Sequence, residues 1–244
     1  MQDSINHSTL TDLIQLLGRR ARPEISWVAQ VAGCSLERAQ QAVNEITQHA
    51  AAVIELCEQI SQTGRTYYAQ FPAPIELFAL VRLTLPKNLV ESGVSSGVSS
   101  TFMLLGLASN QEGVLHSIDF PIERQASGSN PSWSIPSGFS SGWAVPELLK
   151  QRWNLHLGRS EDLLQPLLNE VGAVDLFCHD SPVDEKHFEF EMTTVVSYLK
   201  PGSLVVSDNV DKKIFNTVAQ SVGTKAIYRR KSSLAAFRVP NPTG

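Results

Sequence analysis

Residues 89–101, with the sequence LVESGVSSGVSST, decide how this chain folds. A short apolar run ends in the carboxylate of Glu91, two glycines four positions apart follow, and Phe102 begins an apolar segment. This order predicts a strand, a tight loop and the N-terminus of a helix. Glycine lets the backbone turn sharply and lets a ligand lie against it, and the unpaired N–H groups of a helix start can face a bound group. Gly93 and Gly97 therefore mark a candidate ligand-binding loop.

A second strand with an acidic end follows the predicted helix. Gly113 interrupts the helical pattern, and residues 114–119 read VLHSID. Asp119 lies about 20 residues beyond the second glycine of the loop, which is the spacing at which nucleotide-binding α/β units place a carboxylate on ribose hydroxyls. The loop contains neither G-x-G-x-x-G nor the Gly-Lys-Ser/Thr of a P-loop. A doubly wound nucleotide-binding protein of another kind is the alternative interpretation.

The pattern E-x-G-x-x-x-G-x-S over residues 91–99, followed by a strand that ends in Asp119, resembles the first two motifs of class I S-adenosylmethionine-dependent methyltransferases. The resemblance implies that the two glycines let the methionine part of the cofactor approach the backbone. It also implies that Glu91 and Ser99 are polar contacts near that part, and that Asp119 holds the ribose.

Composition and charge describe an ordinary globular protein. The chain has 244 residues, of which 42% are hydrophobic and 18% charged, enough for one large domain or a domain with an appendage. A formal net charge of −4 gives no global reason to bind nucleic acid. Three scattered cysteines indicate neither a disulfide framework nor a zinc knuckle. No apolar run approaches 18 residues and no signal peptide is visible, so we expect a cytoplasmic protein without membrane contact.

Residues 1–64 are predicted to be a helical N-terminal region, attached to an α/β domain over residues 75–244. Pro23 suits the first position of a helix, and one long helical pattern runs over residues 35–60. The apolar stripe of this region needs a partner surface, because isolated helices bury too little apolar surface to be stable. We expect this region to pack on the α/β domain as a lid, or on a second subunit in a homodimer.

Residues 28–35, VAQVAGCS, resemble the turn of a helix-turn-helix, and nearby arginines could face phosphates. The supposed recognition helix, however, carries Glu37 and Glu45 beside Arg38, which makes a poor surface for a polyanion. We therefore expect no nucleic-acid partner. A DNA-binding regulator that uses its α/β domain as a ligand sensor is kept as an alternative function.

The helical and strand periods are both lost after Asp119. Residues 123–146 are rich in serine, proline and tryptophan, and this connection is long for a compact doubly wound fold. It leaves the carboxyl edge of the predicted sheet, where ligands of such folds bind. We expect a mobile lid, with Trp133, Phe139 and Trp143 as candidates for the wall of the substrate site. A disordered insertion is the alternative.

Residues 155–157 predict a third strand, and a helix opens in the sequence GRSED that follows it. The methyltransferase family places a small polar residue and its neighbour beside the adenine at this turn. The resemblance therefore implies that Ser160 and Glu161 contact the adenine. An N-cap role for Ser160 is a sufficient structural explanation by itself.

Two further strands, over residues 174–180 (VDLFCHD) and 203–209 (SLVVSDN), end in polar side chains. Because the carboxyl ends of parallel strands meet at one edge of a sheet, we expect Asp180, Asp208 and Asn209 to lie near the glycine loop. Three oxygen donors would suit a hard cation such as Mg²⁺. Strand-end capping and turn formation are the alternative roles.

The cluster resembles the metal site of catechol O-methyltransferase-like enzymes, and the His-Asp-Ser of residues 179–181 resembles the bacterial methyltransferase group often labelled type 24. In the catechol enzymes a lysine three residues after the first metal-binding Asp acts as base, and Val183 stands there in this chain. Histidine has an unperturbed pKa of about 6.5, which suits a general base at neutral pH. His179 is therefore a candidate base, and a satisfied histidine at a strand end is the alternative. His179 and Asp180 are thus the predicted catalytic residues. A scaffold that binds cofactor but lacks a base is a second alternative.

The whole chain therefore predicts an α/β fold, with a doubly wound, mostly parallel Rossmann-like sheet closed by an antiparallel pair over residues 225–229 and 234–239. By resemblance, we expect S-adenosylmethionine as cofactor, a small molecule as methyl acceptor, and oxygen as the acceptor atom. The reaction would be an in-line displacement that depends on holding the acceptor close and aligned. A bound Mg²⁺ would orient the acceptor oxygens and lower the pKa of a hydroxyl.

Overall fold

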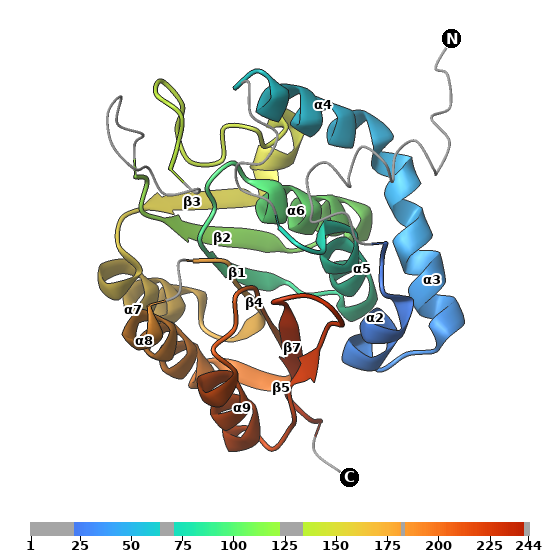
Figure 1. The fold of residues 1–244 in the computed structure, drawn as a ribbon, viewed down its shortest axis with the longest axis vertical. Helices are drawn as coiled ribbons and strands as arrows, with labels where there is room; N and C mark the ends of the chain where they lie inside the picture. The colour runs from blue at the N-terminus through green and yellow to red at the C-terminus, as the bar shows by residue number, and fades with distance from the viewer. Residues whose placement is uncertain (1–21, 64–70, 123–133, 182–183, 242–244) are drawn as a thin grey trace.

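The computed structural model describes residues 22–63, 71–122, 134–181 and 184–241. Its centre is a seven-stranded sheet in the order β3-β2-β1-β4-β5-β7-β6, with helices on both faces (Figure 1). The strands are β1 (Asn88–Ser92), β2 (Val114–Asp119), β3 (Trp153–Leu157), β4 (Val174–His179), β5 (Leu199–Ser207), β6 (Ile227–Tyr228) and β7 (Ala235–Arg238). The doubly wound fold expected from the sequence is confirmed.

Chain direction in the sheet follows from the connections. Strands β1 to β5 are parallel, because each is joined to the next by a helical crossover. Strand β7 runs antiparallel to both β5 and β6 and closes the sheet as predicted. The register aligns Ser92 of β1 with His179 of β4, and His179 with Ser207 of β5. The carboxyl ends of these three strands therefore lie side by side.

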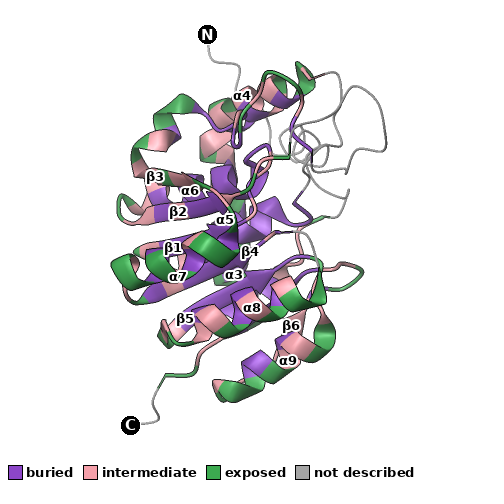
Figure 2. Cartoon of the chain, turned by 90° about the vertical axis from the view of Figure 1, so that its left-hand side faces the viewer, coloured by how far each residue is buried: buried purple, intermediate pink, exposed green. Residues whose placement is uncertain are grey.

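Alternate residues along the strands fill two cores, one on each face of the sheet, because successive side chains of a strand point to opposite faces. Leu89, Leu115 and Leu204 pack with the helices α2 to α6. Val90, Phe177 and Val205 pack with α7, α8 and α9. Figure 2 shows the buried residues along the strands and the inner faces of the helices, with the exposed residues on the outer faces.

The helices on the first face are α2 (Ile25–Ala32), α3 (Leu36–Asn44), α4 (Ala50–Ser61), α5 (Pro74–Thr84) and α6 (Val98–Asn110). The second face carries α7 (Ser160–Val171), α8 (Glu185–Val196) and α9 (Lys212–Ser221). Two 3-10 helices, η1 (Glu45–His49) and η2 (Glu147–Arg152), complete the assignment. Among the helices of the described segments, none is long and apolar enough to cross a membrane.

Two local expectations for the N-terminal region were wrong. Pro23 is not the first helical residue, because α2 begins at Ile25 with Glu24 at its N-cap. The single helix expected over residues 35–60 is interrupted by η1, which separates α3 from α4. Ser35 does cap α3, accepting a hydrogen bond from the backbone N–H of Arg38. The helix expected before residue 22 lies outside the described residues.

The described N-terminal helices share one core with the sheet. Trp27, on α2, is 2% exposed and donates its indole N–H to the carbonyl oxygen of Ile227 on β6. Beside it, Glu76 of α5 and Arg229 form a buried ion pair with an N–O distance of 2.7 Å. The apolar stripe of these helices is therefore covered by the chain's own α/β domain. The homodimer expected from this stripe stays a prediction.

Candidate active site

The carboxylate of Glu91, at the end of β1, is completely buried and holds the glycine loop in place. It accepts hydrogen bonds of 2.6 Å from the hydroxyls of Ser99 and Ser100 on α6 and of Ser117 on β2. Burial, opposed by these hydroxyls, raises the pKa of Glu91 to about 7. The expected role of Glu91 and Ser99 as contacts of the methionine part is untested, and in this structure the two side chains bond to each other.

The two glycines of the loop have positive φ angles, 88° at Gly93 and 93° at Gly97, in the region that disfavours other residues. A Cβ atom on Gly93 would stand 2.4 Å from the carbonyl oxygen of Asp180. On Gly97 it would stand 2.4 Å from a methyl group of Val145. Both glycines thus permit neighbouring loops to approach, which adds a packing reason to the expected contact with a ligand.

Asp119 ends β2 and faces the glycine loop. One carboxylate oxygen accepts a 3.2 Å hydrogen bond from the backbone N–H of Val94, and the other accepts from the hydroxyl of Ser141. Each oxygen has a second lone pair, so the carboxylate can still accept from a ligand. Asp119 lines a cavity, as the prediction that it holds a ribose requires.

Residues 134–146, the described half of the expected lid, lie over the glycine loop. The backbone N–H groups of Gly142 and Ala144 donate to the carbonyl oxygens of Ser95 and Ser96, at 2.7 and 3.1 Å. Ala144 and Val145 are buried against α6. This half is a packed cover, and its mobility with and without ligand stays a prediction. Trp133, one of the suggested wall residues, lies outside the described residues.

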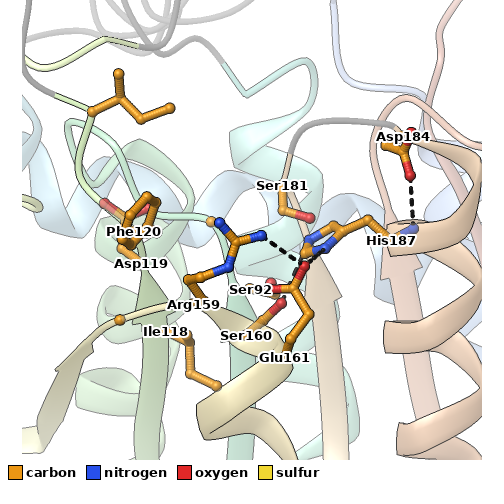
Figure 3. Close-up of a pocket in the computed structure, with 13 residues that line it drawn as sticks. Ser92, Ile118, Asp119, Phe120, Arg159, Ser160, Glu161, Ser181, Asp184 and His187 are labelled. Carbon is orange, nitrogen blue, oxygen red and sulfur yellow. Dashed lines mark hydrogen bonds and ion pairs between the residues drawn. The ribbon is translucent and has the colours of Figure 1, made fainter.

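A cavity of about 320 Å³ opens at the carboxyl ends of β1 to β4, which is at the lower end of the range for small-molecule sites. The ends of β1 and β2 and the segments that follow β1, β2, β3 and β4 supply its wall (Figure 3). The lining residues are Ser92, Gly93, Ile118, Asp119, Phe120, Ile122, Gly158, Arg159, Ser160, Glu161, Ser181, Asp184 and His187. The structure thus brings four predicted cofactor residues to one site: Gly93, Asp119, Ser160 and Glu161.

The turn after β3 supplies one wall of the cavity. Ser160 and Glu161 open α7, and the guanidinium of Arg159 donates to the Glu161 carboxylate at 3.2 Å. Arg159 also lies 5.6 Å from the ring centre of Phe120, a residue 54% exposed at the cavity. The N-cap role suggested for Ser160 is wrong, because Arg159 holds that position and makes no side-chain cap. Ser160 is instead buried beside His187, with 3.4 Å between its hydroxyl and the imidazole Nε2.

The sequence provided no reason to assign a site role to two residues on α8, His187 and Glu191. Glu191 is completely buried and accepts from the hydroxyls of Ser92 and Ser181. Its oxygens also lie 3.2 Å from Nε2 of His179 and 3.1 Å from Nε2 of His187. The sequence does contain one indication: His187 and Glu191 are four positions apart, and residues at that spacing share one face of a helix. Only the fold, however, turns that face toward the cavity.

His179, a predicted catalytic residue, is completely buried at the end of β4. Its Nδ1 lies 3.2 Å from the Ser207 hydroxyl, and its Nε2 meets Ser181 and Glu191. Asp180, the next residue, is half-buried, and its backbone N–H donates to the carbonyl oxygen of Ser92. Of these two, Asp180 is the one with solvent access at the carboxyl edge of the sheet.

The proposed metal ligands have other partners. Asp208 is 2% exposed; one of its carboxylate oxygens accepts from the Ser233 hydroxyl and the other from the Asn209 amide at 3.1 Å. Asn209 has a φ of 51° and turns the chain after β5. Within the described segments, no three His, Cys, Asp or Glu side chains are grouped so that they could hold a metal. The structure thus lends no support to a Mg²⁺ site, and the metal-binding roles expected for Asp180, Asp208 and Asn209 stay predictions.

Comparison with known proteins gives a matching family model and a curated relative. A family model described as a methyltransferase domain matches residues 90–210, from β1 to the end of β5 and the turn after it. A "Putative O-methyltransferase" of Mycolicibacterium vanbaalenii is 32% identical over 131 residues, which are 53% of this chain. The match covers 50% of that relative, so the chain spans about half the length of the curated protein it resembles.

Solved structures of similar fold include two O-methyltransferases. The Bacillus cereus enzyme, in complex with SAH, is 17% identical with a TM-score of 0.53, over 76% of this chain and 90% of that one. TomG from Streptomyces achromogenes, an O-methyltransferase of tomaymycin synthesis in complex with SAM, is 17% identical with a TM-score of 0.55, over 77% and 90%. At this identity the similarity establishes the fold.

Proposed function

We propose, from the match of residues 90–210 to a methyltransferase-domain family, that this chain transfers a methyl group from S-adenosylmethionine to an oxygen of a small molecule. One observation carries the proposal. The cavity at the carboxyl edge of the sheet brings Gly93 and Asp119 together with the turn at Ser160 and Glu161. These are the positions where the family resemblance put the cofactor.

The lining side chains fit an adenosine and its attached chain. Asp119 presents carboxylate oxygens, which suit a pair of ribose hydroxyls. Phe120 and Ile122 offer apolar contact to a base, and Glu161 can accept from an amino group. Gly93 lines the same cavity at the end of β1, where the remainder of the cofactor can pass along the backbone. In this proposal the adenosine half lies between β2 and α7, and the reacting methyl group lies toward Asp180.

S-adenosylmethionine supplies, when bound, a methyl group on a sulfonium sulfur. The protein's part is to hold the acceptor oxygen in line with that methyl group and to exclude water. We propose Asp180 as the first candidate for the group that faces the acceptor, because it is half-exposed at the end of β4. A catalytic role for His179 stays a prediction, and its full burial favours a role in ordering the floor of the site.

We also propose that methyl transfer proceeds without a divalent cation. Asp208 and Asn209 bond to each other, and Asp208 holds Ser233 in the turn between β6 and β7. Their geometry supports a structural role in fixing that turn against β5. No step of the proposed mechanism passes through a metal ion.

Titration calorimetry with S-adenosylmethionine and with S-adenosylhomocysteine tests the function. Wild type should bind both ligands, and Asp119→Ala should weaken binding by about 1.5–3 kcal/mol, because a charge-assisted hydrogen bond to the ribose is lost. Asp162→Ala is the matched control, since it removes an exposed carboxylate of α7 that lies outside the cavity lining. A wild-type protein that binds neither ligand would refute the methyltransferase proposal.

A further inference from the structure

A row of four titratable side chains runs from the cavity into the core. Glu161 stands at the cavity wall, His187 follows, and Glu191 and His179 lie behind it. Exposure falls along the row: the side chain of Glu161 is 39% exposed, that of His187 21%, and those of Glu191 and His179 0%. Acid and histidine alternate, and the row joins α7, α8 and β4. Figure 3 shows its first two members, Glu161 and His187, at the cavity.

His187 bridges two carboxylates. Its Nδ1 lies 3.1 Å from an oxygen of Glu161, and its Nε2 lies 3.1 Å from an oxygen of Glu191. A neutral imidazole has a single N–H donor, whereas the protonated ring has two. Only the protonated ring can therefore donate to both carboxylates at once, and the geometry is that of an imidazolium bridge between α7 and α8.

We propose that His187 is a positioning residue of the cofactor site: its imidazolium fixes Glu161 at the cavity wall, and the adenosine part of the cofactor binds tightly only while that bridge is intact. The inference rests on the proposed function, because it assigns the cavity to the cofactor. It adds a residue that neither the sequence motifs nor the family resemblance singled out.

Loss of the proton would release Glu161 and leave Glu191 in place. Glu191 keeps the hydroxyls of Ser92 and Ser181 and the imidazole of His179. Glu161 would keep Arg159, whose side chain is 58% exposed and pairs with it at 3.2 Å. Exposed ion pairs of this kind hold a side chain only weakly. The Glu161 carboxylate also accepts from its own backbone N–H, so the bridge to His187 is the contact that ties it to α8.

The charges around His187 come from each element packed against it. On α7 they are Glu161 and Arg159, and β4 contributes His179 on the far side of Glu191. On α8 itself they are Glu191 and the exposed Asp184, which accepts from the backbone N–H of His187. The hydrogen bond and charge of Glu191, followed by those of Glu161, raise the pKa of His187 from 6.5 to about 9 against the effect of burial. The effect of the two carboxylates on the pKa of His187 is thus larger than that of the Arg159 guanidinium.

The direction of the pH effect follows from this raised pKa. The protonated ring is favoured by the fold, so the stabilisation is complete below about pH 6.5 and is lost as the pH rises through about 9. If only the bridged form binds tightly, the apparent affinity falls with the fraction of protonated His187. At about pH 10 that fraction is about one tenth, which predicts roughly tenfold weaker binding than at pH 8.

The test is calorimetry between pH 7.5 and 10 with two probes, S-adenosylhomocysteine and methylthioadenosine. Methylthioadenosine lacks the amino acid part, so its own groups do not titrate in this range. Both ligands should bind wild type more weakly at high pH, methylthioadenosine by roughly tenfold. His187→Gln and Glu161→Gln should both bind roughly tenfold more weakly at pH 7.5, with affinities for methylthioadenosine that no longer change with pH.

The matched control is Lys186→Gln, which removes an exposed cation from the adjacent position and should keep the wild-type profile. Histidine resonances of the wild type, assigned by comparison with His187→Gln, should show one ring titrating near pH 9, and Glu161→Gln should lower that value. Should His187→Gln fail to fold, Glu161→Gln and the histidine titration decide the question.

A pH-independent affinity of wild type for methylthioadenosine, or a Glu161→Gln variant with the wild-type profile, would overturn the role of His187 and leave the proposed function standing. A Lys186→Gln variant that loses the pH dependence would also overturn it, by showing a general charge effect. Failure of wild type to bind S-adenosylhomocysteine at any pH would overturn the proposed function, and this inference with it.

Discussion

At the scale of single residues, the donors around a carboxylate decide what it can do. Asp119, Glu91 and Asp208 all stand at carboxyl ends of strands, yet their surroundings differ. Asp119 lines the cavity, Glu91 is saturated by three serine hydroxyls beneath the loop, and Asp208 holds the turn before β7. Strand position made each of them a candidate ligand-binding group, and only Asp119 faces the cavity.

The structural role of Asp208 predicts a loss of stability that cations do not change. Asp208→Ala removes the hydrogen bonds that the buried carboxylate accepts from the half-buried Ser233 and the exposed Asn209, at a cost of about 1–3 kcal/mol in the free energy of unfolding. Thermal unfolding with Mg²⁺ and with excess chelator should give the same difference between variant and wild type. A midpoint of wild type that rises with Mg²⁺, and no longer does so in Asp208→Ala, would restore the metal site.

At the scale of elements, the glycine loop and residues 142–145 form one packed unit. The backbone bonds from Gly142 to Ser95 and from Ala144 to Ser96 fasten this cover to the start of α6. Gly97 lets Val145 and the backbone of Gly142 approach, because a Cβ atom would come within 2.4 Å and 3.2 Å of them. The sequence of the glycine loop therefore has to permit close packing of residues 142–145 as well as contact with any ligand.

Gly97→Ala should destabilise the protein by more than its positive φ alone requires. The matched control is Gly138→Ala, since Gly138 has a φ of 85° and a Cβ atom there would meet nothing within 4 Å. We expect about 1 kcal/mol for the control, from backbone strain, and about 2–4 kcal/mol for Gly97→Ala, where a steric clash is added. Urea unfolding measures both. Equal losses of unfolding free energy in the two variants would show that residues 142–145 shift to accommodate the added methyl group without an energetic penalty.

At the scale of the whole molecule, the N-terminal helices and the last two strands hold each other in place, although nearly the whole chain separates them. Arg229 donates to the carboxylate of Glu76 and to the carbonyl oxygen of Arg22, and Trp27 donates to Ile227. One continuous core runs from α2 to β7. The N-terminal region is therefore part of the folded unit that carries the cavity.

Two neighbouring arginines test this connection. Arg229→Met leaves Glu76 buried without its cation, and it should cost about 3–5 kcal/mol in the free energy of unfolding. Arg230→Met is the matched control: the Arg230 side chain is 79% exposed in its pair with Glu24, and its loss should cost about 1 kcal/mol or less. Chemical unfolding of both variants gives the comparison. Similar small losses of stability in the two variants would mean that the Arg229–Glu76 pair contributes little to holding the N-terminal helices against the last two strands.

Local patterns in the sequence determined the architecture. Apolar runs bounded by glycine and acids predicted β1, β2 and β4, and β2 begins and ends at the expected residues. The antiparallel closing pair was likewise visible as two short apolar runs with a polar turn between them. These features depend on neighbours in the chain, since strand alternation, helix period and turn chemistry are properties of consecutive residues. The carboxyl edge, and with it the position of the cavity, follows from chain direction alone.

The tertiary structure decided which polar groups share that edge and what each one bonds to. Ser92 and Glu191 meet across 99 positions of sequence, and His187 meets Glu161 across 26. Such partners depend on the register of the strands and on which side of α8 faces the cavity, and neither is encoded within a short window. That is why the sequence assigned no role to His187 and Glu191, and why it did not show that Asp208 bonds to Ser233. Burial and partners give a side chain its chemistry, and both are properties of the folded chain.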